Sequence, residues 1–421
     1  GKTSTQVTFG TFHGVFYAIL RHTYRMSGNN ILSEEEKKRL MRELVNHYAR
    51  DLEEEDLEEN LAREISTVKN NQIPLEHYYS ACMPQEKFRE IYEAYEKWRK
   101  ENKKLDFDDL MVQCKRLFLE RPEVLRAWQQ KFQYILIDEF QDISPVQYEI
   151  VRMLALPENN LFIVGDDDQS IYAWRGAVNA MQQLPLPESR LTTSFRFGEE
   201  IALNANAILG ALNEIVPLLG NPLMNSKVVN KPHTKQRDAI LCRTNARAME
   251  LLLAGLVHGE KVSLQADHAK LNRFVDAASM LKQGKRVTDV PELAWFNSWH
   301  DVHEYCETND GSDIKPLVKL VDDHGTDPLK RALAKITPID QADYIISTAH
   351  KAKGLEWERV HIEDDYQFRL NEKDYKISDE ELRLLYVACT RAKVSLNIHH
   401  IYDLMQMLKR EMPQSLRRAV S

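Results

Sequence analysis

Two short apolar runs that end in acidic residues stand out in the hydrophobic pattern of this chain. The first, residues 134–137, is followed by Asp138 and Glu139, and the second, residues 161–164, is followed by a polar loop at 165–177. Apolar runs of this length, bounded by polar loops, predict buried strands of a parallel sheet. Ligands of open α/β sheets bind at the carboxyl ends of the strands, so we expect both loops to face one nucleotide.

Helical periodicity occupies much of the remaining chain. Residues 33–104 are charged, and apolar residues recur there at helical spacing, at Leu40, Met41, Leu44, Val45 and Tyr48. Ser33 and Glu36 form a capping-box pattern, which predicts a helix start. Further apolar runs predict strands at 239–242, 344–347, 359–362 and 395–399. The acidic stretch 271–340 is predicted to be helical, with its aromatic residues Trp295, Phe296 and Trp299 in the core of a small domain.

Composition narrows the class of protein. A chain of 421 residues exceeds one hydrophobic core, so we expect two or more domains. No apolar run approaches the ~20 residues of a membrane span. The five cysteines are dispersed without a CxxC pair, which argues against a zinc or iron–sulfur site and favours a reducing compartment. We therefore expect an intracellular, cytoplasmic protein without a membrane partner, associated with the nucleoid if it is bacterial.

The net charge of −8 does not by itself indicate a nucleic-acid partner. The acid is concentrated locally, as in residues 51–60, which suits a solvated helical face. A protein that moves along nucleic acid needs only a local basic track, so the net charge leaves that function open.

The carboxylates after the first predicted strand suit the magnesium site of a nucleotide, the Walker B arrangement. Asp138 would hold Mg²⁺, and Glu139 would orient the water that attacks the γ-phosphate. Gln169, in the second loop, is a neutral donor and acceptor able to sense a terminal phosphate. For the carboxylate pair taken alone, an acidic turn at a strand end is the alternative.

The second loop also contains two aromatic rings and a guanidinium within four residues: Tyr172, Trp174 and Arg175. Such a group forms a platform on which an unpaired base can stack, at ~1–3 kcal/mol per base. A core aromatic pair would explain the two rings equally well, although it would not explain their polar neighbours.

Five segments resemble, in order, motifs II to VI of the UvrD/Rep/PcrA-like superfamily 1A DNA helicases. They are DEFQD at 138–142, GDDDQSIYAWRGA at 165–177, LTTSFR at 191–196, STAHKAKGLEW at 347–357 and LRLLYVACTRAK at 382–393. TFHGVFYAIL at 11–20 resembles motif Ib, and LDFDDL at 105–110 resembles the segment that re-enters the first motor domain. Within this family, residues 194–202 and the short stretch before motif V are most similar to the F-box DNA helicase branch, although no F-box is visible. Six ordered motifs make coincidence very improbable.

The resemblance implies an α/β fold with two RecA-like parallel-sheet motor domains and helical insertions. The implied domains are motor domain 1A (1–20 and 105–190), the helical 1B insertion (21–104), motor domain 2A (191–270 and 341–421) and a small helical 2B-like insertion (271–340). The 2B domain of UvrD-like proteins is much larger, so we do not expect its regulatory role here.

The resemblance also assigns nucleotide contacts to the second motor domain. Arg196 and Arg391 would contact the γ-phosphate, for which the planar, permanently charged guanidinium is suited. Phe195, where many relatives have Tyr, would stack on adenine. Glu356 would accept from the ribose hydroxyls, and Gly354 would leave room for close backbone approach. Surface ion pairing is the alternative for each arginine.

Two groups of residues are implied to contact single-stranded DNA. Thr11, Phe12 and His13 belong to the first motor domain. His350, Lys351 and Lys353 belong to the segment that couples the DNA backbone to the nucleotide state. The alternatives are that the first group belongs to the core and that the lysines are solvated charges.

The phosphate-binding loop is incomplete. Its only match is Gly1, Lys2 and Thr3, where Lys2 would reach the β/γ-phosphates and Thr3 would ligate Mg²⁺. Only seven residues separate Thr3 from Thr11, whereas a loop, helix and strand need roughly the ~30 residues of a βαβ unit. We therefore expect the printed sequence to omit residues of the protein, both before Gly1 and between about Thr5 and Val7. The alternative is a tag remnant on a truncated protein with little ATPase activity.

The sequence thus predicts an ATP-dependent DNA helicase or translocase that uses ATP and Mg²⁺ in DNA repair or recombination. Its partner would be single-stranded DNA or a 3′-tailed duplex, and the resemblance implies 3′-to-5′ movement. Two alternatives remain at this point: a hydrolysis-deficient scaffold that binds nucleic acid, and an RNA-directed ATPase, because no residue visibly reads the 2′-hydroxyl.

Overall fold

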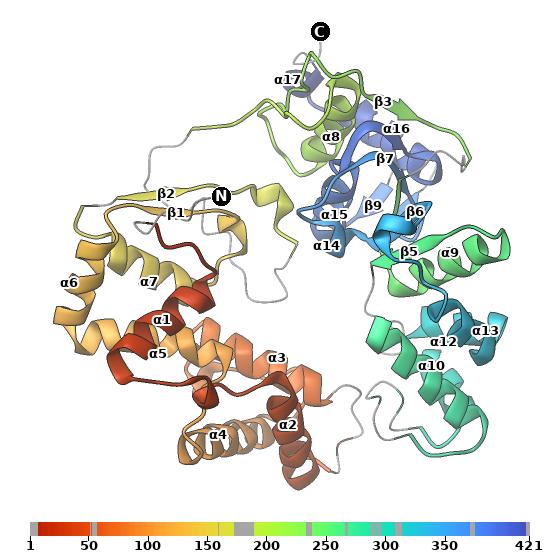
Figure 1. Cartoon of the computed structure of the whole chain (residues 1–421). Coiled ribbons are helices and arrows are strands. Elements are labelled where there is room, and N and C mark those ends of the chain that lie inside the picture. Colours follow the sequence, from red (N-terminus) through yellow and green to blue (C-terminus); the bar gives the residue numbers. More distant parts are fainter. Residues whose placement is uncertain are drawn as a thin grey trace. The chain divides into compact units, whose positions relative to one another are not determined.

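The computed structural model describes residues 7–50, 52, 57–158, 160–171, 189–232, 238–265, 268–287, 290, 293, 296–307, 314–370 and 375–417. The chain divides into two compact units, residues 1–185 (unit 1) and residues 186–421 (unit 2). Unit 1 runs from red to yellow in Figure 1, and unit 2 runs from green to blue. Each unit is described by itself.

Unit 1 combines helices with a two-stranded parallel sheet. Its helices are α1 (Phe12–Tyr24), α2 (Glu34–Tyr48), α3 (Leu57–Asn70), α4 (Gln85–Glu101), α5 (Phe107–Glu120), α6 (Pro122–Lys131) and α7 (Pro145–Ala155). Its strands are β1 (Ile135–Ile137) and β2 (Leu161–Ile163), with Leu136 opposite Phe162. Both strands fall where the apolar runs predicted them, and each is one residue shorter than its run.

The capping box predicted at the start of α2 is confirmed. The Ser33 hydroxyl accepts from the Glu36 amide at 3.2 Å, and the Glu36 carboxylate accepts from the Ser33 amide at 3.0 Å. The helical spacing of the apolar residues has the expected consequence, because Leu40, Met41, Leu44 and Val45 are buried in one cluster with residues of α3 and α4. The 1B-like segment is thus a helical bundle with its own core.

The apolar run predicted a buried strand at β1, but described residues of unit 1 cover only one of its faces. Ile137 is 8% exposed, but Leu136 and its neighbour Phe162 are 73% and 63% exposed. Alternate side chains of a strand point to opposite faces of the sheet. One face packs against Phe140, Ile143 and Val151, and no described residue of unit 1 buries the other.

Buried ions join α3 and α4 to the start of α5. Lys69 Nζ lies 2.8 Å from carboxylate oxygens of both Asp106 and Asp109 and 2.9 Å from Glu96, and Arg99 Nε lies 2.9 Å from Asp109. Burial lowers the pKa of Lys69, but the three carboxylates together raise it above its usual value. Burial and the charge of Asp106 raise the pKa of Asp109 to about 7. The start of α5 is therefore held by buried charges of opposite sign that compensate one another.

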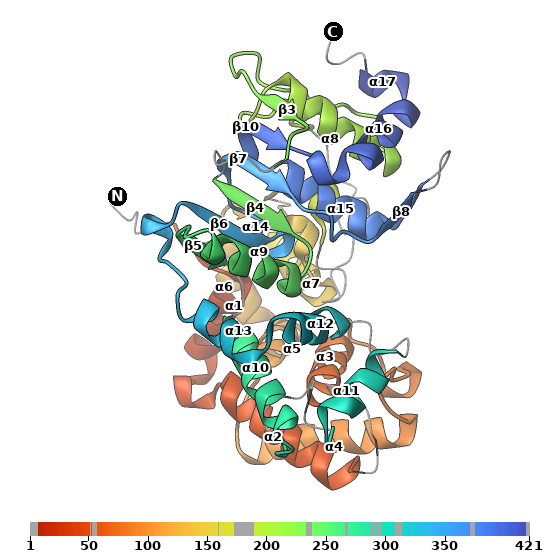
Figure 2. The ribbon, with the colours of Figure 1, turned by 90° about the vertical axis from the view of Figure 1, so that its right-hand side faces the viewer.

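Unit 2 contains a six-stranded sheet in which every pairing is parallel. Its strands, in spatial order, are β3 (Lys227–Val229), β10 (Ala392–Asn397), β7 (Trp357–Ile362), β4 (Ala239–Cys242), β6 (Tyr344–Thr348) and β5 (Val262–Gln265). Figure 2 shows this sheet with helices packed along it. All four side chains of β4 are buried, which is typical of a central strand in a parallel sheet covered on both faces.

Several strand predictions need correction. The strand expected at 395–399 begins three residues earlier, at Ala392. It ends at Asn397, because a 3₁₀ turn begins at His399. The strand expected at 359–362 begins two residues earlier, at Trp357. The sequence analysis did not predict β3, β5 or the antiparallel hairpin of β8 (Phe368–Leu370) and β9 (Tyr375–Ile377). These elements are only three or four residues long, so their pattern is hard to distinguish from a loop.

The helices of unit 2 are α8 (Glu199–Ala211), α9 (Asn245–Val257), α10 (His268–Lys282), α11 (Trp299–Cys306), α12 (Lys315–His324), α13 (Thr326–Leu333), α14 (Ala349–Ala352), α15 (Asp379–Cys389), α16 (Tyr402–Glu411) and α17 (Gln414–Arg417). The described part of the segment 271–340 consists mainly of helices α10 to α13, in agreement with the predicted helical structure. Its helices share one buried cluster with α9 and strands β4 to β6. Trp299 lies in that cluster and Phe296 packs against it, whereas Trp295 is outside the described residues.

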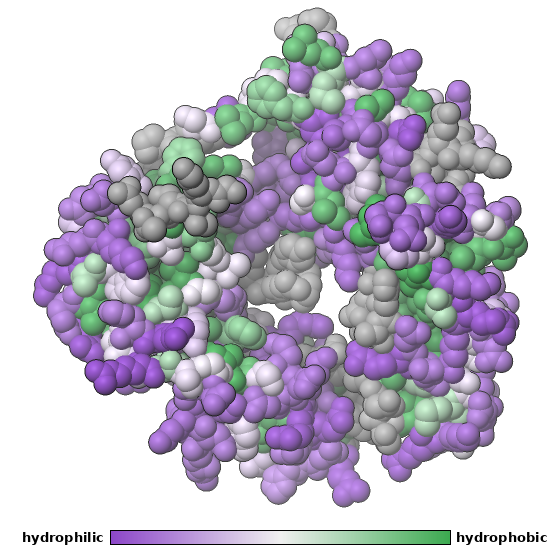
Figure 3. All heavy atoms as spheres, viewed as in Figure 1, coloured by the Kyte–Doolittle hydropathy of each residue, from purple (hydrophilic) through white to green (hydrophobic). Residues whose placement is uncertain are grey.

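Hydrophilic residues cover most of the face drawn in Figure 3, and hydrophobic residues lie among them in small groups. Charged residues make up 29% of the chain, which accounts for this surface. Among the described helices, none is both long and apolar enough to cross a membrane.

Candidate functional site

The predicted Walker B pair lies at the carboxyl end of β1. Glu139 has left-handed backbone angles (φ 53°, ψ 41°), and its amide donates to Asp138 Oδ1 at 2.9 Å. Residues other than glycine rarely adopt this conformation, and those that do are concentrated at functional sites. A 3₁₀ turn at Phe140–Asp142 follows, so the chain bends sharply just after the two carboxylates.

The loop after β2 lies beside this turn. The Val164 amide donates to the Ile137 carbonyl at 2.8 Å, and the Phe140 amide donates to the Val164 carbonyl at 2.9 Å. The parallel pairing continues past the end of β1, and both acidic loops leave the same edge of the sheet. The two loops therefore lie side by side, and the expectation that they face one nucleotide stays a prediction.

Side-chain hydrogen bonds connect Glu139 to Gln169. Gln141 Nε2 donates to Glu139 Oε2 at 2.5 Å, and Gln141 Oε1 accepts from the Asp166 amide at 3.0 Å. Gln169 Nε2 in turn donates to Asp166 Oδ2 at 2.7 Å. Sequence reasoning missed Gln141 and Asp166. Both stand inside the quoted motifs, but their partners depend on turn geometry that spacing alone does not give.

The carboxylates at this edge suit Mg²⁺ with nucleotide. Among the described residues, no group of three or more carboxylate, imidazole or thiolate side chains forms a metal site. Mg²⁺ is usually bound through one or two carboxylates together with substrate phosphates rather than by an all-protein cage. Asp138, at the end of β1, offers the hard carboxylate oxygens that such a shared site needs.

The motif Ib residues are anchored to α1 and the core. The Thr11 hydroxyl caps the helix by accepting from the Gly14 amide at 3.2 Å. Phe12 is half-buried, with its ring centroid 5.8 Å from that of Phe16. The ring of His13 meets Phe107 edge-on at 5.6 Å. Burial lowers the pKa of His13, so at neutral pH its imidazole is uncharged and could contact DNA only by stacking or hydrogen bonding.

Three of the predicted nucleotide contacts of unit 2 cluster together. Arg196 Nε donates to Glu356 Oε2 at 2.8 Å, and Arg196 Nη1 donates to the Thr390 carbonyl at 3.1 Å. The Arg196 hydrogen bond is the main reason why the pKa of Glu356 lies below its usual value. Phe195, next to this pair, is 83% exposed. An aromatic ring so open to solvent is available to stack on a base.

Arg391 is placed differently from Arg196. Its side chain is 2% exposed, and its guanidinium donates to the carbonyls of Val387 at 2.9 Å and Leu355 at 3.3 Å. These bonds tie the end of α15 to the segment before β7. The guanidinium thus satisfies backbone acceptors here, and the predicted contact with the γ-phosphate stays a prediction.

The motif V segment crosses the sheet of unit 2. β6 ends at Thr348 and β7 begins at Trp357, and both strands pair in parallel with β4. Residues 349–356 therefore run from the carboxyl edge of one strand to the amino edge of the other. His350 and Lys351 lie in α14 near the first edge, and Glu356 lies at the second.

Gly354, within this crossing segment, has φ +82°, and no heavy atom lies within 4 Å of an added Cβ. Its positive φ is a reason for glycine that the sequence analysis did not identify. Lys351 is exposed and Lys353 is half-buried. The segment thus links the predicted DNA contacts to the predicted ribose contact through one short stretch of backbone.

The remaining predicted site residues lie outside the described residues. They are Gly1, Lys2 and Thr3 of the partial phosphate-binding loop and Tyr172, Trp174 and Arg175 of the predicted stacking platform.

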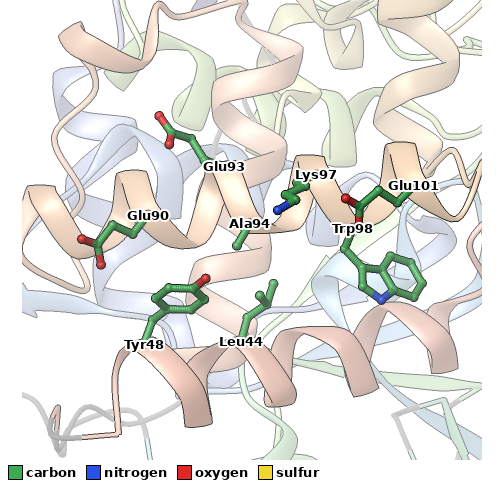
Figure 4. Close-up of a pocket in the computed structure, with 8 residues that line it drawn as sticks. All are labelled: Leu44, Tyr48, Glu90, Glu93, Ala94, Lys97, Trp98 and Glu101. Carbon is green, nitrogen blue, oxygen red and sulfur yellow. The ribbon is translucent and has the colours of Figure 1, made fainter.

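A shallow groove of about 590 Å³ lies between α2 and α4 of unit 1 (Figure 4). Leu44 and Tyr48 of α2 face Ala94 and Trp98 of α4, and the other lining residues are Glu90, Glu93, Lys97 and Glu101. Three carboxylates against one ammonium make this groove unfavourable for a phosphate backbone. It is therefore not a candidate for the DNA track.

Comparisons with known proteins agree with the ordered motifs. Residues 1–184 match the UvrD/REP helicase N-terminal domain, and residues 261–402 match the UvrD-like helicase C-terminal domain. ATP-dependent DNA helicase PcrA of Leuconostoc citreum is 35% identical over 219 residues, which are 49% of this chain and 29% of that protein. DNA helicase II of Escherichia coli is 34% identical over 222 residues, which are 50% of this chain and 30% of that protein.

A further PcrA, from Staphylococcus aureus strain Mu50, is 38% identical over 157 residues, which are 37% of this chain and 21% of that protein. The matches to these three relatives each span less than a third of the relative's length. The two domain matches lie in order along the chain, and they imply RecA-like motor domains. The parallel sheet of unit 2 is the sheet expected of such a domain. The chain belongs to the UvrD-like family of superfamily 1A helicases.

Proposed function

We propose that the whole protein is an ATP-dependent DNA helicase or translocase that moves 3′ to 5′ on single-stranded DNA, in repair or recombination. The observation that carries the proposal is the acidic edge of unit 1, where Glu139 and Gln169 are joined by hydrogen bonds at the ends of two adjacent parallel strands. A carboxylate that orients water, beside an amide that contacts the terminal phosphate, is typical of the active site of an NTPase.

In unit 1, Asp138 holds Mg²⁺, Glu139 orients the attacking water and Gln169 contacts the terminal phosphate. Lys2 and Thr3 of the phosphate-binding loop hold the β/γ-phosphates and Mg²⁺. Mg²⁺ held by these residues would supply positive charge to the phosphate oxygens. The left-handed backbone at Glu139 supports this assignment, because non-glycine residues with such angles are enriched at functional sites.

In unit 2, Phe195 stacks on adenine, Glu356 accepts from the ribose hydroxyls, and Arg196 and Arg391 contact the γ-phosphate. The exposure of the Phe195 ring and its position beside Arg196 support the first three assignments. Gly354 permits the backbone conformation that leads into Glu356.

The DNA strand is held by stacking and by local positive charge. Tyr172, Trp174 and Arg175 supply the stacking platform, together with Thr11, Phe12 and His13 of motif Ib. His350, Lys351 and Lys353 contact the strand from unit 2. We also propose the division into domains 1A, 1B, 2A and 2B given by the sequence analysis.

Matched oligonucleotides and tailed duplexes test this proposal on the full-length protein. We expect single-stranded DNA to stimulate ATP hydrolysis more than RNA of the same sequence, and a 3′-tailed duplex to be unwound in preference to a 5′-tailed one. Equal or greater stimulation by RNA would instead identify an RNA-directed ATPase. Strand binding without hydrolysis would identify a scaffold.

A further inference from the structure

Gln141 lies between the two acidic loops of unit 1 and contacts both through its side-chain amide. Its Nε2 donates to Glu139 Oε2 at 2.5 Å, and its Oε1 accepts from the Asp166 amide at 3.0 Å. The residue is 1% exposed, so water does not compete for these bonds. A buried carboxamide has to satisfy both its donor and its acceptor, and here it does so on the loops of two different strands.

Asp166 extends the connection to Gln169. Its Oδ2 accepts from Gln169 Nε2 at 2.7 Å, and its carbonyl accepts from the Gln169 amide at 2.9 Å. The position of the Gln169 side chain thus depends on Asp166, whose own amide is held by Gln141. Three successive hydrogen bonds run from the Glu139 carboxylate to the Gln169 carboxamide.

Neither of the two side chains closest to glutamine in size would make both contacts of Gln141. Glutamate could accept from the Asp166 amide but could not donate to Glu139, and it would place a second negative charge beside that carboxylate. Methionine fills a similar volume and makes neither bond. The carboxamide is therefore the element that ties the β1 loop to the β2 loop at their functional ends.

We propose that Gln141 is a positioning residue that fixes the Glu139 carboxylate relative to Gln169, and so couples the group that orients water to the group that senses the terminal phosphate. The inference rests on the proposed function. Gln141 touches neither nucleotide nor metal in this account and acts only through Glu139 and Asp166.

Two substitutions in the full-length protein test this coupling. Gln141→Met removes both hydrogen bonds, and Gln141→Glu keeps only the acceptor for the Asp166 amide. We expect each to lower kcat for DNA-stimulated ATP hydrolysis about 10-fold or more, with little change in KM for ATP. Rates are normalised to folded protein by the stoichiometry with which a non-hydrolysable ATP analogue binds.

Gln147→Glu is the matched control. Gln147 Oε1 accepts from the Ser144 amide at 2.9 Å in the capping box of α7, and a glutamate serves this position equally well. The same chemical change six positions further along should leave kcat unchanged. A loss as large as that of Gln141→Glu would overturn the proposal, because it would show a general sensitivity to added charge.

A double-mutant cycle separates positioning from a merely structural role. If Gln141 acts by fixing Glu139 relative to Gln169, the double variant Gln141→Met with Gln169→Ala should have a kcat within about two-fold of that of the more impaired single variant. Losses that multiply would overturn the coupling. Unchanged kcat in the Gln141 variants of an active wild type would also overturn it. An inactive wild type, or full activity in Glu139→Gln, would overturn the proposed function and the coupling with it.

Discussion

Arg196 and Glu356, 160 positions apart in the chain, form an ion pair in which the Arg196 Nε lies 2.8 Å from Glu356 Oε2. Both side chains are partly exposed, at 30% and 46%. The residues proposed to contact the γ-phosphate and the ribose therefore contact each other. We propose that nucleotide competes with this ion pair for the two side chains.

Arg196→Ala should separate activity from stability. An arginine that contacts the transferred phosphate contributes ~10³-fold or more to turnover, so we expect a loss of that order in DNA-stimulated hydrolysis. A partly exposed ion pair contributes about 1 kcal/mol or less to the free energy of unfolding, so stability should hardly change. Steady-state kinetics and urea denaturation measure the two effects.

Arg359→Ala is the control for that variant, because Arg359 also forms a partly exposed pair in unit 2, with Asp238 at 2.7 Å. It should keep full turnover. Equal losses in the two variants would remove Arg196 from the nucleotide site.

Phe195→Ala should weaken ATP binding without weakening the fold. The ring is 83% exposed, so its removal should change the free energy of unfolding by about 0.5 kcal/mol or less. Loss of stacking should raise the Kd for ATP, and Phe195→Tyr should restore it. Leu223→Ala, at a residue that is 92% exposed in the same unit, should leave the Kd unchanged. An unaltered Kd in Phe195→Ala would exclude the adenine contact.

Gly354→Ala should destabilise unit 2 through backbone conformation alone. At φ +82° a Cβ costs ~1–2 kcal/mol although no neighbour obstructs it, and Asn, which tolerates left-handed angles, should cost less. Gly28→Ala, at an equally open position without a positive φ, should be neutral. Denaturation midpoints distinguish the three variants, and equal stability of Gly354→Ala and wild type would contradict the backbone argument.

Lys69→Met should be among the most destabilising single changes in unit 1. It leaves Asp106, Asp109 and Glu96 without the ammonium that lies within 2.9 Å of each, and breaking such a buried network costs ~3–5 kcal/mol. Lys104→Met removes a more exposed pair, with Glu36 at 2.8 Å, and should destabilise unit 1 much less than Lys69→Met does. Similar losses in the two variants would show that burial of the network is not the source of its strength.

Local patterns predicted the elements whose signals are strong. The four apolar residues of β4 and the capping box of α2 specify their elements through burial and helix-end hydrogen bonds, and both lie where the sequence placed them. The exposed face of Leu136 was not predicted, because an apolar run indicates a strand without saying how many faces are covered.

The contacts of the candidate site were harder to predict than its residues. Motif order assigned Arg196 and Arg391 the same role. Arg196, however, forms a partly exposed ion pair, whereas Arg391 is buried and donates to backbone carbonyls. The bridge through Gln141 depends on the turn that Glu139 opens with a positive φ. Such relations arise from backbone geometry between distant segments, which residue types and spacing do not encode one position at a time.

The most direct test of the central claim is steady-state ATP hydrolysis by the full-length protein, with and without single-stranded DNA, for wild type and Glu139→Gln. We predict strong stimulation by DNA in the wild type, and in the variant ATP binding without measurable turnover, because the amide cannot act on the attacking water as the carboxylate does. DNA-stimulated turnover that survives in Glu139→Gln would contradict the account, and so would a wild type that binds DNA but hydrolyses no ATP.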